Sequence, residues 1–282
     1  MARFNYIITI HNKEDMIAKV ITAVLMCARD GSRIYPVIDG CTDRTEEIID
    51  GIAANFEGVP VTKVHVNDVH ELLSINAGLR AASHEGSGYN IVLQDDVILA
   101  DFMLEDKIES VYRTIGPSLG YTSLRLGANF KKDALSSREA IPYCDYVENV
   151  YGHDLENVTS IRPGQLAFRT VPIKSPVCIP FELVRKIGLY NEELAPYGHD
   201  DPEYALRCID HGYRNAVFPV RFYSEVAWGG TRKNPHPELN AIIARNMDRI
   251  RGLHSGLLRK VCSNPQDLDI IDLDGALGRR TP

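Results

Sequence analysis

The sequence predicts an α/β protein built on a mostly parallel central sheet. Short apolar runs recur through the first hundred residues and alternate with segments whose apolar positions repeat at helical spacing. Helices of this length between strands favour crossover connections, and such connections join parallel strands. The chain has 282 residues, a length that fits one large domain or two small ones.

The first strand and the first helix form the clearest pair. Tyr6–Ile10 is an apolar run, and a helical apolar face begins at Met16. Asn12 is the expected N-cap of this helix, and Gly31 is its stop signal.

The second strand is expected over Ile34–Ile38, where Pro36 indicates an exposed or irregular strand. Asp43 is the expected N-cap of the next helix, with Glu46 at its third position. A strand, a helix and a strand then follow over Val61–Val66, about His70–Ala82 and Tyr89–Leu93.

The second half of the chain is harder to interpret. Residues 101–180 are less regular, and the stretch Gly127–Gln165 within them is rich in charged and turn residues. Three later segments are clearer: a short helix over Pro180–Ile187 that ends at Gly188, a strand over Tyr213–Val220 and a last helix near Leu239–Leu253.

Composition narrows the classes of function. The chain has 31 Lys and Arg against 38 Asp and Glu, and this acidic balance argues against a general nucleic-acid binder. No apolar run approaches the roughly 18 residues of a transmembrane helix, and the first apolar run is too short for a signal peptide. Six cysteines without a C-x-x-C motif favour reduced, packed thiols in a cytoplasmic protein.

Several enzyme classes lose their main sequence support. The turn after the first strand has neither the glycine-rich fingerprint of dinucleotide-binding domains nor a P-loop. The chain also has no G-x-S-x-G elbow and no H-E-x-x-H motif.

Polar and acidic residues follow each of the four early strands. Ligands of parallel sheets bind beyond the carboxyl ends of the strands, so these residues together predict a binding site. Each one alone is also compatible with a helix cap or a turn. In chain order they are His11, Asn12 and Glu14; Asp39 and Asp43; Asn67 and Asp68; and Gln94, Asp95 and Asp96.

Two acidic points carry specific hypotheses. Asp95 and Asp96 suit Mg²⁺ or Mn²⁺, which proteins commonly hold with one or two carboxylates while substrate phosphates complete the shell. Asp201 has two compatible interpretations, a general base that deprotonates a hydroxyl and an N-cap for a helix with Pro202 in its first turn. A capping role predicts a lowered pKa, and hence a weaker base.

The order and spacing of these segments resemble the family 2 glycosyltransferases, which have the GT-A fold. The similarity spans most of residues 4–230. It lies in the family's apolar strand with Asn-Arg/Lys-Glu, its VDDGSTDxT segment, its D-x-D motif and its vGxFDE … ED-x-D-L-x-x-R segment. The corresponding stretches here are Ile7–Glu14, Val37–Thr45, Leu93–Asp96 and Ile187–Arg207.

The resemblance implies a three-layer, Rossmann-like GT-A domain in three parts. Residues 1–100 would form the half that binds the nucleotide-sugar donor. Residues 101–230 would form the half that binds the acceptor and carries the catalytic base, and 231–282 would form a C-terminal helix and a polar tail.

The implied activity is that of an inverting glycosyltransferase of the hexosyltransferase type. It would move a sugar from a nucleoside diphosphate sugar to a hydroxyl of a glycan, glycolipid or glycoprotein, with help from Mn²⁺ or Mg²⁺. Asp201, beside Asp200, would be catalytic, and Asp96 and Asp95 would hold the metal. Acceptor-binding residues would be His199 and Trp228, and donor-binding residues Thr9, His11, Asn12, Glu14, Asp39, Asn76 and Asp95.

Some positions depart from the family pattern. Gln94 replaces the first carboxylate of the D-x-D motif, so the metal is expected to be held either more weakly or through water. Asp200 replaces the usual Glu before the base, so the base is either Asp201 or Asp200. Trp228 stands where many members carry a His, and it either removes a metal ligand or supplies an aromatic platform for a sugar.

The polar segment after Trp228 leaves two further alternatives. His236 is either a late metal ligand or a solvated side chain, and Arg232 and Lys233 either meet the diphosphate or lie on the surface. Two other functions also compete with glycosyl transfer. One is a nucleotidyltransferase, although the basic glycine-rich loop typical of that class is missing after the first strand. The other is a catalytically silent module that binds a nucleotide sugar or a glycan, which Gln94 favours.

Overall fold

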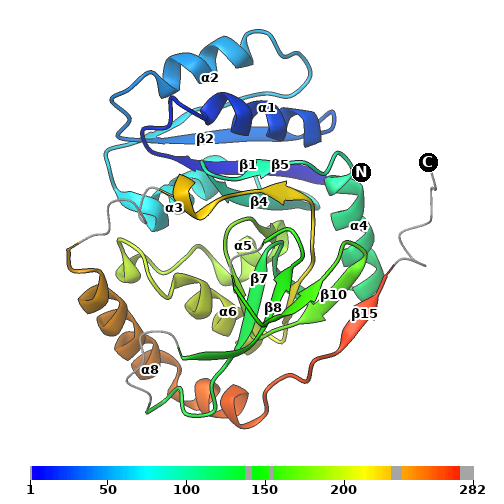
Figure 1. Cartoon of the computed structure of the whole chain (residues 1–282), viewed down its shortest axis with the longest axis vertical. Helices are drawn as coiled ribbons and strands as arrows, with labels where there is room; N and C mark the ends of the chain where they lie inside the picture. Colours follow the sequence, from blue (N-terminus) through cyan, green and yellow to red (C-terminus); the bar gives the residue numbers. More distant parts are fainter. Residues whose placement is uncertain (1, 137–141, 153–154, 230–236, 274–282) are drawn as a thin grey trace.

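The computed structural model describes residues 2–136, 142–152, 155–229 and 237–273. Its centre is a nine-stranded sheet in the order β15-β10-β13-β6-β12-β4-β1-β2-β3. Figure 1 shows this sheet running from β2 and β1 through β4 towards β10 and β15. Two small sheets accompany it, one in the order β11-β7-β8-β9 and one that pairs β14 with β5.

The first hundred residues form the parallel part of the sheet, as the alternation of strands and helices predicts. Strand β1 lies between β2 and β4, and β2 lies between β1 and β3, all in parallel pairs. The elements here are β1 (Arg3–Ile10), α1 (Ile17–Cys27), β2 (Arg33–Asp39), α2 (Thr45–Ala53), β3 (Val64–Val66), α3 (His70–Ala81), β4 (Gly88–Gln94) and β5 (Ile98–Leu99).

Beyond β4 the sheet is mixed. Strand β12 is antiparallel to both β4 and β6, and β6 is parallel to β13. The strands are β6 (Leu119–Ser123), β7 (Leu126–Phe130), β8 (Tyr143–Asn149), β9 (Thr159–Ile161), β10 (Gln165–Phe168), β11 (Val171–Ile173), β12 (Val177–Pro180), β13 (Arg214–Val217), β14 (Phe222–Tyr223) and β15 (Ile270–Asp272). The helices are α4 (Leu104–Ile115), α5 (Phe181–Ile187), η1 (Glu192–Leu194), α6 (Asp200–Asp210), η2 (Val226–Trp228) and α8 (Leu239–Ser263).

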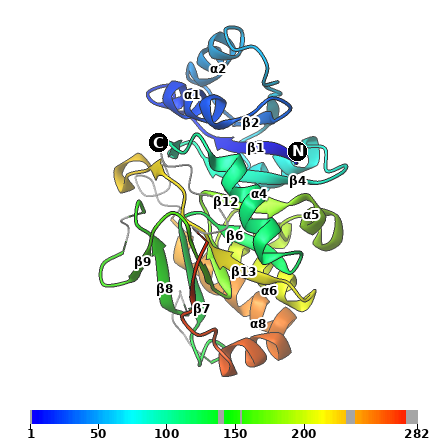
Figure 2. The same ribbon diagram turned by 90° about the vertical axis from the view of Figure 1, so that its right-hand side faces the viewer.

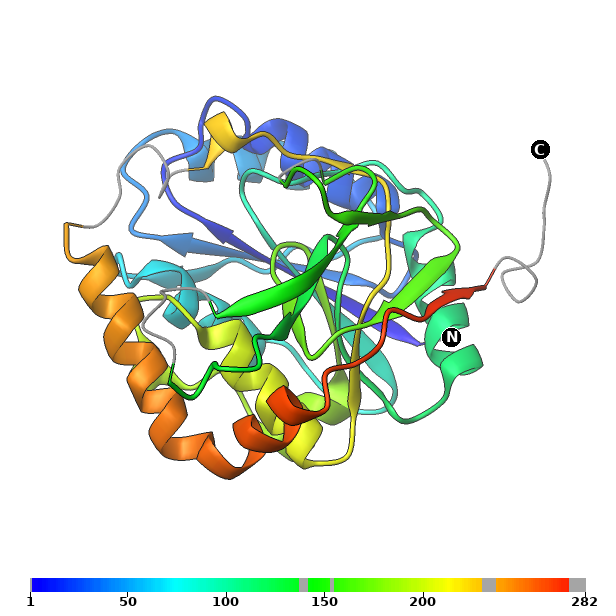
Figure 3. The same cartoon turned by 60° about the horizontal axis from the view of Figure 1, so that its bottom comes forward.

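Helices cover both faces of the sheet and make three layers. Successive residues of β1 point to opposite faces, so Ile8 packs in the core with α1 and α4, while Ile7 packs in the core with α3 and α6. Helix α8 contacts α6 on its outer side (Figures 2 and 3). Within the described residues, no helix combines the length and apolarity needed to cross a bilayer.

Most expected elements are confirmed within a few residues, and one strand occupies an unexpected place. Pro36 does not mark an exposed strand, because β2 is internal and Pro36 pairs with Ile8. The nitrogen of Pro36 faces β3, where pairing is interrupted between the bridge at Val61 and the partner at Val64. No ladder hydrogen bond is therefore lost, and an internal strand tolerates this proline.

The expected helix caps are wrong at two positions and displaced at a third. Helix α1 begins at Ile17, and Asn12 instead accepts a hydrogen bond from the backbone N–H of Thr42. Helix α6 begins at Asp200, so Asp201 lies inside its first turn and is not its N-cap. Asp43 accepts from the N–H of Thr45, the first residue of α2, from one position before the cap.

Helix α8 extends past the expected end of the last helix. It continues to Ser263 after a residue with non-helical backbone angles, His254. The expected stop near Leu253 therefore coincides with this kink and not with the end of the helix.

Candidate active site

The loop after β1 lies against the ends of β2 and β4. The backbone N–H of His11 donates to Oδ2 of Asp95 at 2.9 Å, and Nδ1 of His11 lies 2.6 Å from the carbonyl oxygen of Asp39. The ammonium of Lys13 lies 3.7 Å from Oδ1 of Asp95 and donates to the carbonyl of Trp228. Parallel pairing thus brings three predicted positions, His11, Asp39 and Asp95, to one sheet edge.

The turns after β1 and β2 are tied together by side-chain caps. Oδ1 of Asn12 accepts from the N–H of Thr42 at 2.8 Å, and Oε2 of Glu14 accepts from the N–H of Arg44 at 3.0 Å. In the other direction, Oδ2 of Asp43 accepts a hydrogen bond from the backbone N–H of Glu14. Asn12 adopts a left-handed backbone with φ 47°, which places its amide over the second turn. Asn12 and Glu14 therefore shape the rim of the site, and both residues are exposed.

Asp39 is buried at the end of β2 and holds the turn before α3. Its Oδ1 accepts from the backbone N–H of Val69 at 2.7 Å. The next residue, Gly40, has φ 60°, and a Cβ there would approach the Cβ of Asp68 to 2.9 Å. Only glycine fits this close crossing of two turns. Asp39 is thus held by neighbouring backbone at the same edge as Asp95.

Asp95 and Asp96 are both largely withdrawn from solvent. Burial raises the pKa of Asp95 to about 7, against the opposing effects of Lys13 and the N–H of His11, and the Asp96 charge adds to the rise. Asp96 is buried at 9% exposure and is close enough to Glu71 to raise its pKa. The two adjacent carboxylates thus face different surroundings, the β1 loop for Asp95 and the α3 side for Asp96.

The donor set of Asp95 and Asp96 fits part of a metal site. Among the described residues, no group of three or more His, Cys, Asp or Glu side chains is arranged to hold a metal ion. Mg²⁺ and Mn²⁺ are commonly held by one or two carboxylates plus substrate phosphates, which is the set this edge offers. Asp96 is the better ligand of the two, because the Asp95 oxygens already face the His11 N–H and the Lys13 ammonium.

A second acidic cluster surrounds a buried lysine. The ammonium of Lys174 forms an ion pair with Asp200 and lies 3.5 Å from Oε1 of Glu71, and the lysine side chain is 9% exposed. The backbone N–H of Lys174 donates to Oδ2 of Asp201 at 3.2 Å. Burial lowers the pKa of Lys174, but Asp200, Glu71 and Asp201 outweigh it and leave the pKa above its usual value. The lysine is therefore a fixed positive charge.

Asp201 combines deep burial with two hydrogen bonds. The hydroxyl of Tyr121 donates to its Oδ1 at 2.6 Å, opposite the Lys174 N–H on Oδ2. Burial raises the pKa of Asp201 to about 7, Lys174 and Tyr121 oppose the rise, and Asp200 adds to it. The prediction of a lowered pKa for Asp201 is therefore wrong. Asp201 does not cap α6, and its burial raises the pKa.

The remaining predicted positions fall on both sides of the site. His199 precedes α6 in a left-handed conformation with φ 62°, and its Nδ1 lies 2.9 Å from the hydroxyl of Tyr143. Trp228 is half-buried against the core that includes α1, and its carbonyl accepts from the Lys13 ammonium in the loop after β1. Arg232, Lys233 and His236 lie outside the described residues.

Two predicted donor-binding residues face the interior. Thr9 is buried inside β1, between Gln94 and Val37. Asn76 is fully buried in α3, where its amide donates to the carbonyl of Tyr190 and accepts from the N–H of the same residue. Asn76 therefore fixes the segment before η1, and its polar atoms do not reach the sheet edge.

One hydrogen bond connects the sheet edge at Asp95 and Asp96 with the acidic cluster around Lys174. The amide of Gln94, at the end of β4, donates to Oε1 of Glu71 at 2.7 Å, and the same oxygen faces Lys174. The sequence identifies Gln94 as a departure from the family pattern, but it gives no signal for Lys174, Glu71 and Tyr121. Each lies alone in the sequence without a motif, and only the pairing of β12 with β4 and β6 brings them together.

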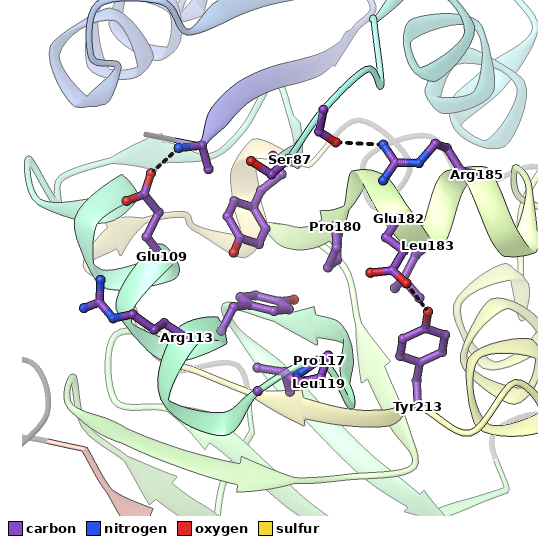
Figure 4. A pocket seen from close by; sticks show the side chains of 16 residues that line it. Ser87, Glu109, Arg113, Pro117, Leu119, Pro180, Glu182, Leu183, Arg185 and Tyr213 are labelled. Atoms are coloured by element: carbon purple, nitrogen blue, oxygen red, sulfur yellow. Dashed lines mark hydrogen bonds between the residues drawn. The ribbon is translucent and has the colours of Figure 1, made fainter.

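A cavity lies where β4 begins, away from the carboxyl ends of the parallel strands. Its volume is about 590 Å³, and Gly88 at the start of β4 lines it. Figure 4 shows Tyr213 and Pro180 at this cavity, with Glu109 bonded to the N-terminal segment and Glu182 to Tyr213. Its charged side chains bond within the protein, and the clustered carboxylates lie at the opposite strand ends.

Comparison with protein families agrees with the arrangement at the strand ends. Residues 6–115 match the model of the family described as Glycosyl transferase family 2. This part of the chain is therefore similar to the family 2 glycosyltransferases. The match includes the first three segments of the resemblance and ends before the Asp200–Asp201 segment. A comparison with curated proteins finds no match.

Solved structures confirm the GT-A fold of this chain. The mannosyltransferase PcManGT from Pyrobaculum calidifontis, in complex with GDP-Man and Mn²⁺, is 14% identical with a TM-score of 0.55, over 92% of this chain and 72% of that one. TarS from S. aureus with UDP-GlcNAc is 13% identical with a TM-score of 0.55, over 93% and 73%. GalNAc-T7 with UDP, GalNAc and Mn²⁺ is 12% identical with a TM-score of 0.59, over 79% and 44%.

Proposed function

We propose that this glycosyltransferase moves a hexose from a nucleoside diphosphate sugar to a hydroxyl acceptor, with inversion and with Asp201 as the general base. The observation that carries the proposal is the state of Asp201. Its buried carboxylate has a pKa near 7 and is fixed by Tyr121 and Lys174. A general base works best when its pKa lies near the working pH.

The proposed donor site lies at the ends of β1, β2 and β4. Asp39 and Asp95 lie there beside the His11 loop, and Asn12 and Glu14 form the rim. The nucleotide sugars in the PcManGT and TarS structures, GDP-Man and UDP-GlcNAc, support a donor of this class. In this proposal residues 1–100 bind the donor, residues 101–230 bind the acceptor, and the C-terminal segment 231–282 supports α6 through α8.

Asp96, with Asp95 beside it, would hold a divalent cation together with the phosphates of the donor. When bound, Mn²⁺ or Mg²⁺ neutralises charge on the diphosphate. The Mn²⁺ in the PcManGT and GalNAc-T7 structures supports this assignment. Lys13, which lies 3.7 Å from Asp95, adds a positive charge of the protein to the same edge.

The transfer is a single displacement at the anomeric carbon. The acceptor oxygen forms a bond to that carbon as its proton passes to the Asp201 carboxylate. The bond to the diphosphate oxygen breaks on the opposite face, and its electron pair leaves with the diphosphate. One displacement inverts the configuration. His199 lies next to the catalytic pair, on the acceptor side.

Two measurements test this function. In a thermal-shift screen of UDP, GDP, dTDP and CDP with Mn²⁺, Mg²⁺ or EDTA, we expect one nucleotide to stabilise the protein in a metal-dependent way. We expect Asp201→Asn to abolish transfer and to leave nucleotide binding nearly intact. Asp210→Asn, at the far end of the same helix, is the matched control. Retained transfer in Asp201→Asn contradicts the assignment of the base.

A further inference from the structure

Lys174 is a buried cation that no segment of the family resemblance includes. It follows β11 and points its ammonium between α6 and α3, where it pairs with Asp200 and faces Glu71. A buried lysine needs carboxylate partners, because an unpaired charge in the interior is strongly unfavourable. Its position between two acidic side chains of different helices satisfies that need.

Lys174 acts on the catalytic pair through two separate groups. Its ammonium pairs with Asp200, and its backbone N–H donates to Oδ2 of Asp201. The aromatic ring of Tyr190 lies 5.6 Å from the ammonium and covers another side of it. One residue therefore constrains both carboxylates at the start of α6.

The ammonium of Lys174 is also held from the side of α3 and β4, where the donor is proposed to bind. Oε1 of Glu71 faces Lys174 at 3.5 Å and accepts from the amide of Gln94 at 2.7 Å. The backbone N–H of Gln94 in turn donates to the hydroxyl of Ser175, the residue after Lys174. Gln94 thus holds the lysine segment at two points, one through Glu71 and one through Ser175.

The polar groups facing Asp201 come from several elements. Tyr121 of β6 and the Lys174 segment bond to the carboxylate directly. Asp200 on the same helix, Tyr190 before η1 and Tyr143 of β8 are the other groups whose charges interact with it. Among these described neighbours, Lys174 is the cation.

We propose that Lys174 is a positioning residue for glycosyl transfer, whose ammonium and backbone N–H together keep the Asp201 carboxylate oriented and ionised. This inference rests on the proposed role of Asp201 as the base. It also gives Gln94 a function in this chain. A glutamine amide donates to Glu71, whereas a carboxylate at that position would face the Glu71 carboxylate.

The test measures the ionisation of Asp201 directly. Protein with ¹³C-labelled aspartate carboxyl groups is titrated by NMR, and the signal that disappears in Asp201→Asn assigns Asp201. The compared variants are Lys174→Met, Lys174→Arg and the control Lys107→Met. Lys107 also pairs with a buried carboxylate, Asp101, away from the site. In parallel, kcat for release of UDP or GDP from UDP-GlcNAc or GDP-mannose is measured against pH.

We expect Lys174→Met to move the Asp201 midpoint upward by about one pH unit or more, because a cation that favours the ionised form is lost. The acidic limb of the kcat profile should move with it, so that kcat at pH 7 falls about fivefold or more and recovers at higher pH. KM for the donor should stay within about twofold. Lys174→Arg should restore most of both effects, and Lys107→Met should change neither.

Other outcomes separate the two proposals. An unmoved Asp201 midpoint in Lys174→Met overturns the role of Lys174, even when Asp201→Asn abolishes transfer. Retained transfer in Asp201→Asn overturns the proposed base and this inference with it. Should Lys174→Met fail to fold, the double variant Lys174→Met with Glu71→Gln keeps the net charge of the cluster. The Asp201 midpoint is then measured in this double variant.

Discussion

The hydroxyl of Tyr121 lies 2.6 Å from Oδ1 of Asp201 and donates a hydrogen bond to it. The hydroxyl of Tyr190 in turn donates to that of Tyr121 at 3.0 Å, and the rings of Tyr190 and Tyr204 stack with centroids 4.7 Å apart. These side chains are buried, so the chain of hydroxyls is fixed from β6 to the first turn of α6. The orientation of Asp201 is therefore set by packing as well as by charge.

The Tyr121 hydrogen bond predicts a pH dependence. A general base acts in its ionised form, so kcat should rise with pH through about 7 and level off above it. The hydrogen bond from Tyr121 favours the ionised carboxylate, and Tyr121→Phe removes it. We expect the acidic limb of the kcat profile to move to higher pH and the free energy of unfolding to fall by about 1–2 kcal/mol.

A matched control for this variant is Tyr112→Phe. The Tyr112 hydroxyl is also buried and donates to the carbonyl of Gly120 at 2.7 Å, away from Asp201. Its loss should cost similar stability and leave the pH profile in place. The same acidic limb in Tyr121→Phe as in the wild type would show that the hydrogen bond does not act on the catalytic base.

The proposed cation site predicts a loss specific to metal-dependent binding. Asp96→Ala removes the better placed carboxylate ligand, so the nucleotide that binds in the presence of Mn²⁺ should bind at least about tenfold more weakly. Calorimetry with and without EDTA measures the effect. Binding in EDTA should be equal in variant and wild type, and the exposed Asp30→Asn should match the wild type throughout. An equal loss in EDTA would assign Asp96 a structural role.

The parallel half of the fold could be predicted because its signals are local. The apolar run Tyr6–Ile10 and the helical face after Met16 need no distant partner to be recognised, and parallel pairing then places the residues that follow each strand at one edge. His11, Asp39 and Asp95 meet there for this reason. The segment 101–180 could not be predicted, since its strands are short and pair across the small and the large sheet.

The expected caps fail for a related reason. Asn12 and Asp201 are residue types that suit an N-cap, but each side chain bonds to a segment distant in the sequence, Thr42 for the first and Tyr121 for the second. Tertiary hydrogen bonds replaced the local ones, and both positions lie at the site. Lys174 could not be predicted from the sequence at all. Nothing in its local sequence indicates that acidic side chains of two helices, Glu71 and Asp200, lie beside it.

The contact between Gln94 and Glu71 predicts a swap experiment. Gln94→Glu places a second carboxylate at hydrogen-bond distance from Oε1 of Glu71. We expect a loss of about 1–3 kcal/mol in the free energy of unfolding at pH 8. The loss should shrink towards pH 5, because a proton shared between the two carboxyl groups relieves the repulsion.

The reversed pair is the control. Gln94→Glu combined with Glu71→Gln exchanges the donor and the acceptor, so it should recover most of the stability at pH 8. The interaction free energy of this double-mutant cycle measures the coupling of the two side chains. Additive effects of the two substitutions would mean that Gln94 does not hold Glu71.

The C-terminal helix carries the last prediction. Asn246 of α8 is fully buried, and its amide donates to the carbonyl oxygens of Leu194, Tyr197 and Gly198, the segment before Asp200 and Asp201. Asn246→Ala leaves these carbonyls without their donor and should lower the free energy of unfolding by about 2–3 kcal/mol. Because Gly198 also donates its N–H to Asp200, a displaced turn should lower kcat as well.

Urea denaturation and kcat at saturating donor measure the two effects. Asn240→Ala on the exposed side of the same helix should change stability by less than about 0.5 kcal/mol and leave kcat unchanged. A stability loss in Asn246→Ala with wild-type kcat would show that α8 supports the fold without positioning the catalytic pair. Loss of both would show that the carboxylates of α6 depend on a helix that lies outside the matched family segment.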